Sequence, residues 1–301
     1  MTAASIRTYL ELVRFSHTIF ALPFAIMATL IALRFQADGG PAVAWPRAIA
    51  GILVCMVAAR TAAMAFNRLV DRTIDAANPR TANRHLPRGA VGTGEVLLLV
   101  AGSSAAFIAS TLLFLPNWLP LVLSAPVLAW LLGYSFAKRF TMLAHVWLGV
   151  ALGLAPVAAW IAIRGSVLID HPIDILPAAI LGIAVTLWVA GFDIIYACQD
   201  AQFDAGHGLE SIPARLGVPR ALDLAKWLHA ATVLALATLP LAVPELGVIY
   251  WVALAAIVAL LAWEHSLVRP DDLSRVSDAF FTANALIGVV LLAAIALDLC
   301  R

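Results

Sequence analysis

Residues 175–192 read ILPAAILGIAVTLWVAGF, a stretch without Asp, Glu, Lys or Arg, and Asp193 follows it directly. A helix that crosses a membrane needs about 20 mostly apolar residues, because the hydrocarbon layer is about 30 Å thick. The stretch therefore predicts a membrane-spanning helix. It also places an acidic residue at the end of that span, where an ionisable group is costly and usually functional.

Similar apolar stretches recur along the 301-residue chain. Hydrophobic residues make up 63% of the chain and charged residues 12%, whereas a water-soluble domain has about 25% charged residues. We predict an all-α polytopic membrane protein with nine transmembrane helices in a single domain, residues 1–301. The predicted spans are residues 15–33, 48–66, 96–115, 116–137, 140–163, 175–192, 227–244, 246–263 and 279–297.

Charge and cysteine content exclude other classes of protein. The net charge of +1 gives no basic surface of the kind that binds nucleic acid. Cys55, Cys198 and Cys300 are scattered and form no CxxC pair, which excludes a secreted disulfide scaffold.

The basic residues of the loops predict the orientation of the chain, because Lys and Arg concentrate on the cytoplasmic side of a membrane. With the N-terminus inside, most basic residues fall in inner segments, and the outer segments hold only Arg34, Arg47, Arg164 and Arg301. We therefore predict the N-terminus inside and the C-terminus outside. Two inner connections, near residues 68–93 and 199–220, are long and polar, which is typical of functional loops.

An acidic cluster stands at the start of the first long connection. Asn67, Asp71 and Asp75 are four residues apart, so on a helix they lie on one face. Mg²⁺ is usually held by one or two carboxylates together with phosphate oxygens and water. The neighbouring Arg68 and Arg72 suit a phosphate group as well.

A second acidic cluster stands at the start of the other long connection. Asp193, Asp200 and Asp204 follow one another at spacings of seven and four, and Tyr196 precedes Asp200 by four. The two clusters could hold Mg²⁺ ions that grip one diphosphate and stabilise it as a leaving group, with Lys138 contributing positive charge. The alternative is that each cluster is only a solvated helix end.

Arg60 lies inside a predicted span, seven residues before Asn67 and on the same helix face. One interpretation is a structural arginine paired with an acid. The other is a cation that receives an anionic group such as a carboxylate. Arg14 could serve likewise, although the cytoplasmic bias of basic residues also explains it.

On these residues the chain resembles the UbiA family of integral-membrane prenyltransferases, in particular its bacterial 4-hydroxybenzoate polyprenyltransferase branch. The NxxxDxxxD motif of that family matches Asn67, Asp71 and Asp75. Its DxxYAxxDxxxD motif matches Asp193, Tyr196, Ala197, Asp200 and Asp204, and a Tyr-x-x-x-Lys-Arg segment matches Tyr134, Lys138 and Arg139. His85 is a departure, because relatives usually have Pro there.

The resemblance implies helices around a central cavity capped by two cytoplasmic loops, in the bacterial inner membrane. It implies Mg²⁺-dependent transfer of a polyprenyl group from a polyprenyl diphosphate to the ring of an aromatic acid, 4-hydroxybenzoate, in quinone biosynthesis. Membrane lipid is a further partner, and no obligate protein partner is implied. The implied Mg²⁺ ligands are Asp71, Asp75, Asp200 and Asp204, and Asp193 is a further catalytic residue. The implied substrate-binding residues are Asn67, Arg60, Arg72, Tyr134, Lys138, Arg14 and Tyr196.

Three alternatives remain at this point. The same chemistry on a 1,4-dihydroxynaphthoate would serve menaquinone synthesis, and one arginine pocket would suit either aromatic acid. An ion-coupled transporter of a small aromatic would use the acids as an ion path, but such a path needs acids spread through the membrane depth. A terpene cyclase on the same scaffold would need no aromatic acceptor.

Overall fold

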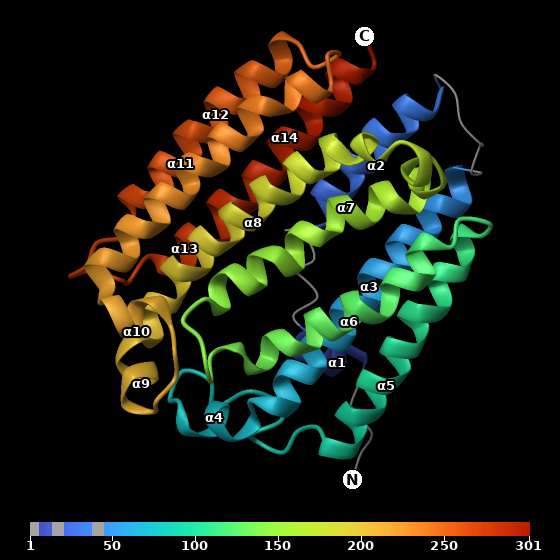
Figure 1. Ribbon diagram of the computed structural model, residues 1–301. Coiled ribbons are helices and arrows are strands. Elements are labelled where there is room, and N and C mark those ends of the chain that lie inside the picture. Colours follow the sequence, from blue (N-terminus) through green and yellow to red (C-terminus); the bar gives the residue numbers. More distant parts are fainter. Residues whose placement is uncertain (1–5, 14–20, 38–44) are drawn as a thin grey trace. The chain divides into compact units, whose positions relative to one another are not determined.

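The computed structural model describes residues 6–13, 21–37 and 45–301 (Figure 1). These described residues are largely helical and contain no β-strand, in agreement with the predicted all-α class. The chain divides into two compact units, one of residues 1–18 and 46–136 and the other of residues 19–45 and 137–301.

The first unit is formed by three long helices and two short ones. They are α1 (Ile6–Leu12), α3 (Trp45–Val70), α4 (Arg72–Ala77), α5 (Thr93–Ser110), which continues as a 3₁₀ turn (Thr111–Phe114), and α6 (Leu119–Ala137). Ala65 of α3 and Val96 of α5 lie in one buried apolar cluster with Leu12. A side chain at Gly51 would lie 2.8 Å from the ring of Phe114, so only glycine lets α3 approach that turn.

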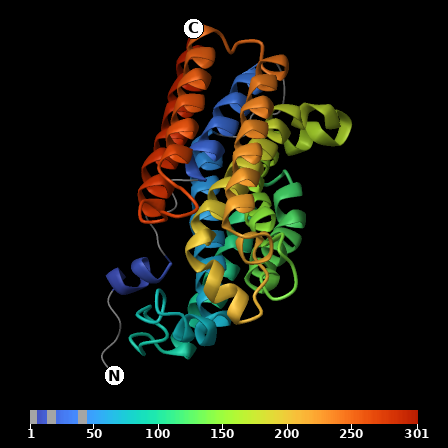
Figure 2. The ribbon, with the colours of Figure 1, turned by 90° about the vertical axis from the view of Figure 1, so that its left-hand side faces the viewer.

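The second unit contains six long helices: α2 (Leu22–Ala37), α7 (Ala144–Asp170), α8 (Leu176–Ala197), α11 (Val218–Ala242), α12 (Val248–Ser266) and α14 (Asn284–Leu299). The helix α8 packs against α7 and α11, and α2 packs against α7 and α14. The short elements are η3 (Pro172–Ile175), η4 (Cys198–Asp200), α9 (Ala201–Gly206), α10 (Ile212–Leu216), α13 (Val276–Asp278) and the π-turn η5 (Ala279–Ala283). Figure 2 shows α9 and α10, in gold, beyond one end of α8.

Glycines bring α7 and α8 into backbone contact. A Cβ atom at Gly149 would clash with the backbone oxygen of Thr186, and one at Gly182 would lie 2.9 Å from the backbone oxygen of Gly153. Small residues at such crossings let membrane helices approach closely, because packing rather than the hydrophobic effect drives their association. These glycines therefore join α7 and α8 into one tightly packed pair.

A buried polar network links α8, α12 and α14. Trp188 Nε1 donates to Asn284 Oδ1 at 2.6 Å, and Asn284 Nδ2 donates to Glu264 Oε1 at 2.9 Å. All three residues are buried. Buried polar groups are stable only when they are hydrogen-bonded, so this network specifies how the three helices pack.

Eight helices of the described residues are long and apolar enough to cross a membrane. They correspond to eight of the nine predicted spans. The remaining span corresponds to α2, a shorter apolar helix over residues 22–35, and its predicted beginning at residue 15 lies outside the described residues. The protein is a multi-pass membrane protein.

Several helices extend beyond the predicted spans, because helical hydrogen bonding does not stop where polar residues begin. The predicted span 140–163 is observed as α7, which continues past Arg164 to Asp170. Asp174 of η3 accepts two hydrogen bonds from Arg164, at 2.7 and 2.6 Å. This pairing compensates the buried charge of Arg164 and lets the helix continue through it.

Candidate active site

The first acidic cluster lies where α3 passes into α4. Asn67 is in the last turn of α3, Asp71 stands between the two helices and Asp75 lies in α4. The amides of Asp71 and Asp75 donate to the carbonyl oxygens four residues earlier, at 2.9 and 2.7 Å. Helical hydrogen bonding therefore continues across the junction, and Asn67 Nδ2 donates to Asp71 Oδ2 at 2.8 Å.

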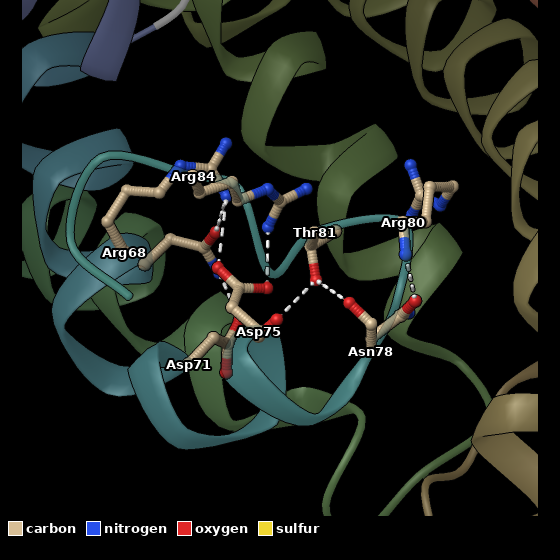
Figure 3. Close-up of polar contacts among 8 residues, drawn as sticks. Arg68, Asp71, Asp75, Asn78, Arg80, Thr81 and Arg84 are labelled. Carbon is tan, nitrogen blue, oxygen red and sulfur yellow. Dashed lines mark hydrogen bonds and ion pairs between the residues drawn. The ribbon is translucent and has the colours of Figure 1, made fainter. Parts of the chain in front are cut away.

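Asp75 is buried, with 5% of its surface exposed. Arg84 donates to Asp75 Oδ1 at 2.6 Å, and Arg68 lies 3.8 Å from Asp75 Oδ2 (Figure 3). A buried carboxylate is stable when cations and hydrogen bonds compensate it. Among the described residues no hydrogen bond reaches Asp75 Oδ2, so this oxygen retains the capacity to bind a cation.

The loop after α4 folds back and places Arg84 in contact with Asp75. Asn78 Oδ1 accepts the amide of Arg80 at 2.9 Å, a local contact that favours a turn. Thr81 Oγ1 donates to the backbone oxygen of Asp75 at 2.9 Å. Figure 3 shows both contacts on the same side of α4 as the Asp75 carboxylate.

The second acidic cluster lies where α8 ends. Asp193 is still within α8, Asp200 ends the 3₁₀ turn η4, and Asp204 lies in α9. The single helix face predicted from the spacings of seven and four is therefore interrupted at residues 198–200. Asp200 and Asp204 are both buried, at 7% and 3% exposure.

Lys138 provides the positive charge next to Asp204. Its Nζ lies 3.5 Å from Asp204 Oδ2, and no hydrogen bond reaches that oxygen from the described residues. The amide of Glu210 donates to the carbonyl oxygen of Lys138 at 2.6 Å. The chain after α9 is therefore hydrogen-bonded to the segment that carries this lysine.

Asp193 contacts a histidine. His145 Nδ1 lies 2.7 Å from Asp193 Oδ2, and His145 Nε2 lies 3.4 Å from the amide nitrogen of Ile212. His145 has 0% exposure. The imidazole thus connects the beginning of α7 with α8 and α10.

The remaining predicted residues of the first unit lie on α3, α4 and α6. Arg60 is partly buried on α3, two helical turns before Asn67, and Arg72 is exposed at the first residue of α4. Tyr134 is partly exposed in the last turn of α6. Arg14 lies outside the described residues.

In the second unit, Tyr196 is partly buried and packs against an apolar cluster that includes Ile195 and Ile212. Its predicted role in substrate binding stays a prediction.

The donors present suit Mg²⁺. Carboxylate oxygens are the protein ligands that this ion prefers, and Asp75 and Asp204 each have a buried oxygen that accepts no hydrogen bond from the described residues. Within those residues, no group of three or more His, Cys, Asp or Glu side chains is arranged to hold a metal ion by itself. Each such oxygen suits an ion that takes much of its coordination from phosphate and water.

Arg84 and His145 are partners of the predicted aspartates that no sequence pattern indicated. Arg84 is one of several regularly spaced arginines in its loop, and only the loop conformation singles it out. His145 is 48 residues from Asp193, and no spacing rule connects residues on two helices.

Comparisons with known proteins show to which family the chain is similar. The family model described as the UbiA prenyltransferase family matches residues 21–286. A relative named 4-hydroxybenzoate octaprenyltransferase, from Nitrosomonas europaea, is 31% identical over 299 residues, covering 98% of this chain and 96% of the relative.

Solved structures of UbiA homologues share the fold. A UbiA homologue from Aeropyrum pernix K1 is 36% identical, with a TM-score of 0.80 over 94% of this chain and 98% of that one. A UbiA homologue from Archaeoglobus fulgidus, bound to DMAPP and Mg²⁺, shares the fold at 21% identity, with a TM-score of 0.70 over 97% and 99% of the two chains. With matches that run along nearly its whole length, the chain belongs to the UbiA prenyltransferase family.

Proposed function

We propose that this protein transfers a polyprenyl group from a polyprenyl diphosphate to the ring of 4-hydroxybenzoate, in a reaction that requires Mg²⁺. The observation that carries the proposal is the same chemistry in two segments that follow long apolar helices. In each segment a buried aspartate faces a basic side chain, Arg84 beside Asp75 and Lys138 beside Asp204. The relatives named 4-hydroxybenzoate octaprenyltransferase support the choice of reaction.

Asp71, Asp75, Asp200 and Asp204 would hold Mg²⁺ together with the diphosphate of the donor. Bound Mg²⁺ would neutralise the charge of the diphosphate and improve it as a leaving group. The solved homologue with DMAPP and Mg²⁺ supports this use of the ion.

The surrounding residues would orient the carboxylates and bind the phosphate groups. Asn67 keeps Asp71 in place through its side-chain amide. Arg72, which is exposed at the start of α4, and Lys138 would bind phosphate oxygens, and Tyr134 would assist them. The ring carbon next to the acceptor's hydroxyl would then take the prenyl group and lose its proton.

Arg60 would bind the carboxylate of the acceptor, with Arg14 as a second candidate. A guanidinium group binds a carboxylate through paired, charge-assisted hydrogen bonds. We expect Arg60→Ala to raise the acceptor KM about tenfold, the effect of losing one charge-assisted contact, with little change in the donor KM. Unchanged acceptor KM and kcat would make Arg60 a structural residue.

We also propose that residues 1–301 form a single domain in a bacterial inner membrane, with the N-terminus inside and the C-terminus outside. A reporter that is active only in the cytoplasm, fused after Arg301, should be inactive. An active fusion would contradict the orientation.

The deciding experiment is an assay of the purified protein with one long-chain prenyl diphosphate, with and without Mg²⁺. Separate reactions contain 4-hydroxybenzoate, 1,4-dihydroxynaphthoate or no acceptor, and mass spectrometry identifies the product. A prenylated 4-hydroxybenzoate that forms only with Mg²⁺ is the expected result. A prenylated naphthoate alone would identify 1,4-dihydroxynaphthoate as the acceptor. A cyclised prenyl product without acceptor would indicate a terpene cyclase. Uptake of the acid by proteoliposomes without any product would indicate a transporter.

A further inference from the structure

The contacts of His145 define its hydrogen-bonding state. The amide of Ile212 can only donate, so His145 Nε2, 3.4 Å away, is the acceptor. In a neutral imidazole the other nitrogen then carries the hydrogen, and Nδ1 donates it to Asp193 Oδ2 at 2.7 Å. The carboxylate of Asp193 thus selects the tautomer whose lone pair faces Ile212.

Ile212 belongs to the segment that follows the second acidic cluster. The amide of Leu209 donates to the backbone oxygen of Asp204 at 2.9 Å, and the amide of Glu210 donates to the carbonyl oxygen of Lys138 at 2.6 Å. Ser211 has 0% exposure, and its hydroxyl accepts the amide of Ala214 as the cap of α10. Residues 209–212 are therefore hydrogen-bonded to Asp204 in α9, to Lys138 just after α6 and, through Ile212, to His145 at the beginning of α7.

His145 is buried among apolar helices, and its two ring nitrogens are used by two different partners. A buried imidazole is costly unless its polar atoms are satisfied, so the packing at this position depends on Asp193 and on Ile212 together. Ile212 also belongs to the apolar cluster that packs α10 against α8 and α11.

We propose that His145 is a positioning residue for the second acidic cluster. It acts through Ile212 on the segment 204–212 and so aligns Asp204 with Lys138 for binding the diphosphate of the donor. Asp193 orients His145. The kinetic part of this inference rests on the proposed function, whereas the structural part does not.

Two substitutions separate the two contacts of the ring. In His145→Gln, the side-chain oxygen reaches about as far as Nε2 and can accept the amide of Ile212. In His145→Asn, the shorter amide reaches about as far as Nδ1 and can donate to Asp193 but not reach Ile212. His145→Ala removes both contacts.

We expect His145→Ala and His145→Asn to raise the donor KM about tenfold, with the acceptor KM unchanged, and His145→Gln to stay close to the unaltered protein. Amide hydrogen exchange without substrates should rise about tenfold in residues 204–212 of the Ala and Asn variants, because a lost hydrogen bond lowers the local opening free energy. Exchange in α12 should not change.

His229→Ala is the matched control. His229 is also buried and uses both ring nitrogens, which contact His265 and the backbone oxygen of Trp188 at 2.9 and 3.2 Å. We expect this variant to lower Tm without changing the donor KM or the exchange of residues 204–212.

The inference would be overturned if the Asn and Gln variants had the same donor KM and the same exchange in residues 204–212. It would also be overturned if His145→Ala and His229→Ala did not differ in these two measurements. If His145→Ala does not fold, the Asn and Gln pair decides. If the unaltered protein transfers no prenyl group, the proposed function fails, while the exchange experiment still decides the role of His145.

Discussion

The two acidic segments hold their aspartates in place in different ways. Asp75 is held by Thr81 and Arg84, the farther of them nine residues away in the sequence. Asp204 and Asp193 depend instead on Lys138, which directly follows α6, and on His145, at the beginning of α7. The first segment therefore depends on local folding of its own loop, and the second on side chains that come from distant parts of the chain.

The largest expected effect is common to both segments and tests whether they share a function. We expect Asp71→Asn and Asp200→Asn each to slow Mg²⁺-dependent turnover by about a hundredfold or more, the scale seen when one preorganised electrostatic group is lost. Asparagine keeps the shape and removes the charge. Turnover is measured on protein whose helical circular dichroism and elution volume are unchanged. Near-normal turnover in either variant would remove that segment from the site.

A smaller effect should distinguish the segments. Arg84→Ala removes the short contact to a buried carboxylate, and we expect a loss of about 2 kcal/mol, typical of a hydrogen bond between charged groups. Lys138→Ala removes a longer contact from a side chain that is 33% exposed, so we expect less than about 1 kcal/mol. Thermal unfolding in detergent gives the ranking.

Arg88→Ala is the control for these two variants, because Arg88 is exposed in the same loop as Arg84 and should leave Tm unchanged. A Lys138 variant less stable than the Arg84 variant would reverse the comparison.

An effect smaller than that of Arg84→Ala tests the local folding of the first segment alone. Thr81→Val keeps the volume of the side chain and removes the hydroxyl that donates to the backbone of Asp75. We expect a loss of about 1 kcal/mol and a modest rise in the donor KM. Thr81→Ser, which retains the hydroxyl, should lose less. Equal loss in both variants would assign the effect to packing rather than to the hydrogen bond.

The same contrast explains what could be predicted from the sequence. Apolar runs predict membrane helices because the signal lies within each run. The four-residue spacing from Asn67 to Asp75 correctly indicated continuous helical geometry, because helical hydrogen bonds cross the α3–α4 junction. The break at residues 198–200 gives no comparable signal, since this short segment forms a 3₁₀ turn within a nearly continuous helical stretch.

Partners that come from elsewhere in the chain were harder to predict. The contact of His145 with Asp193 arises from two helices packing together, and a single sequence carries no trace of that pairing. Arg84 could not be distinguished from Arg80 and Arg88 before the loop conformation was known.

The backbone contact between α7 and α8 limits how a long isoprenoid chain can reach this enzyme from the bilayer. At Gly149, Gly153 and Gly182 there is not even room for a methyl group, so no hydrocarbon tail can wedge between these two helices. A substrate that arrives from the bilayer must therefore enter elsewhere. Replacing these glycines with larger residues would weaken the packing of α7 against α8 rather than create an entrance.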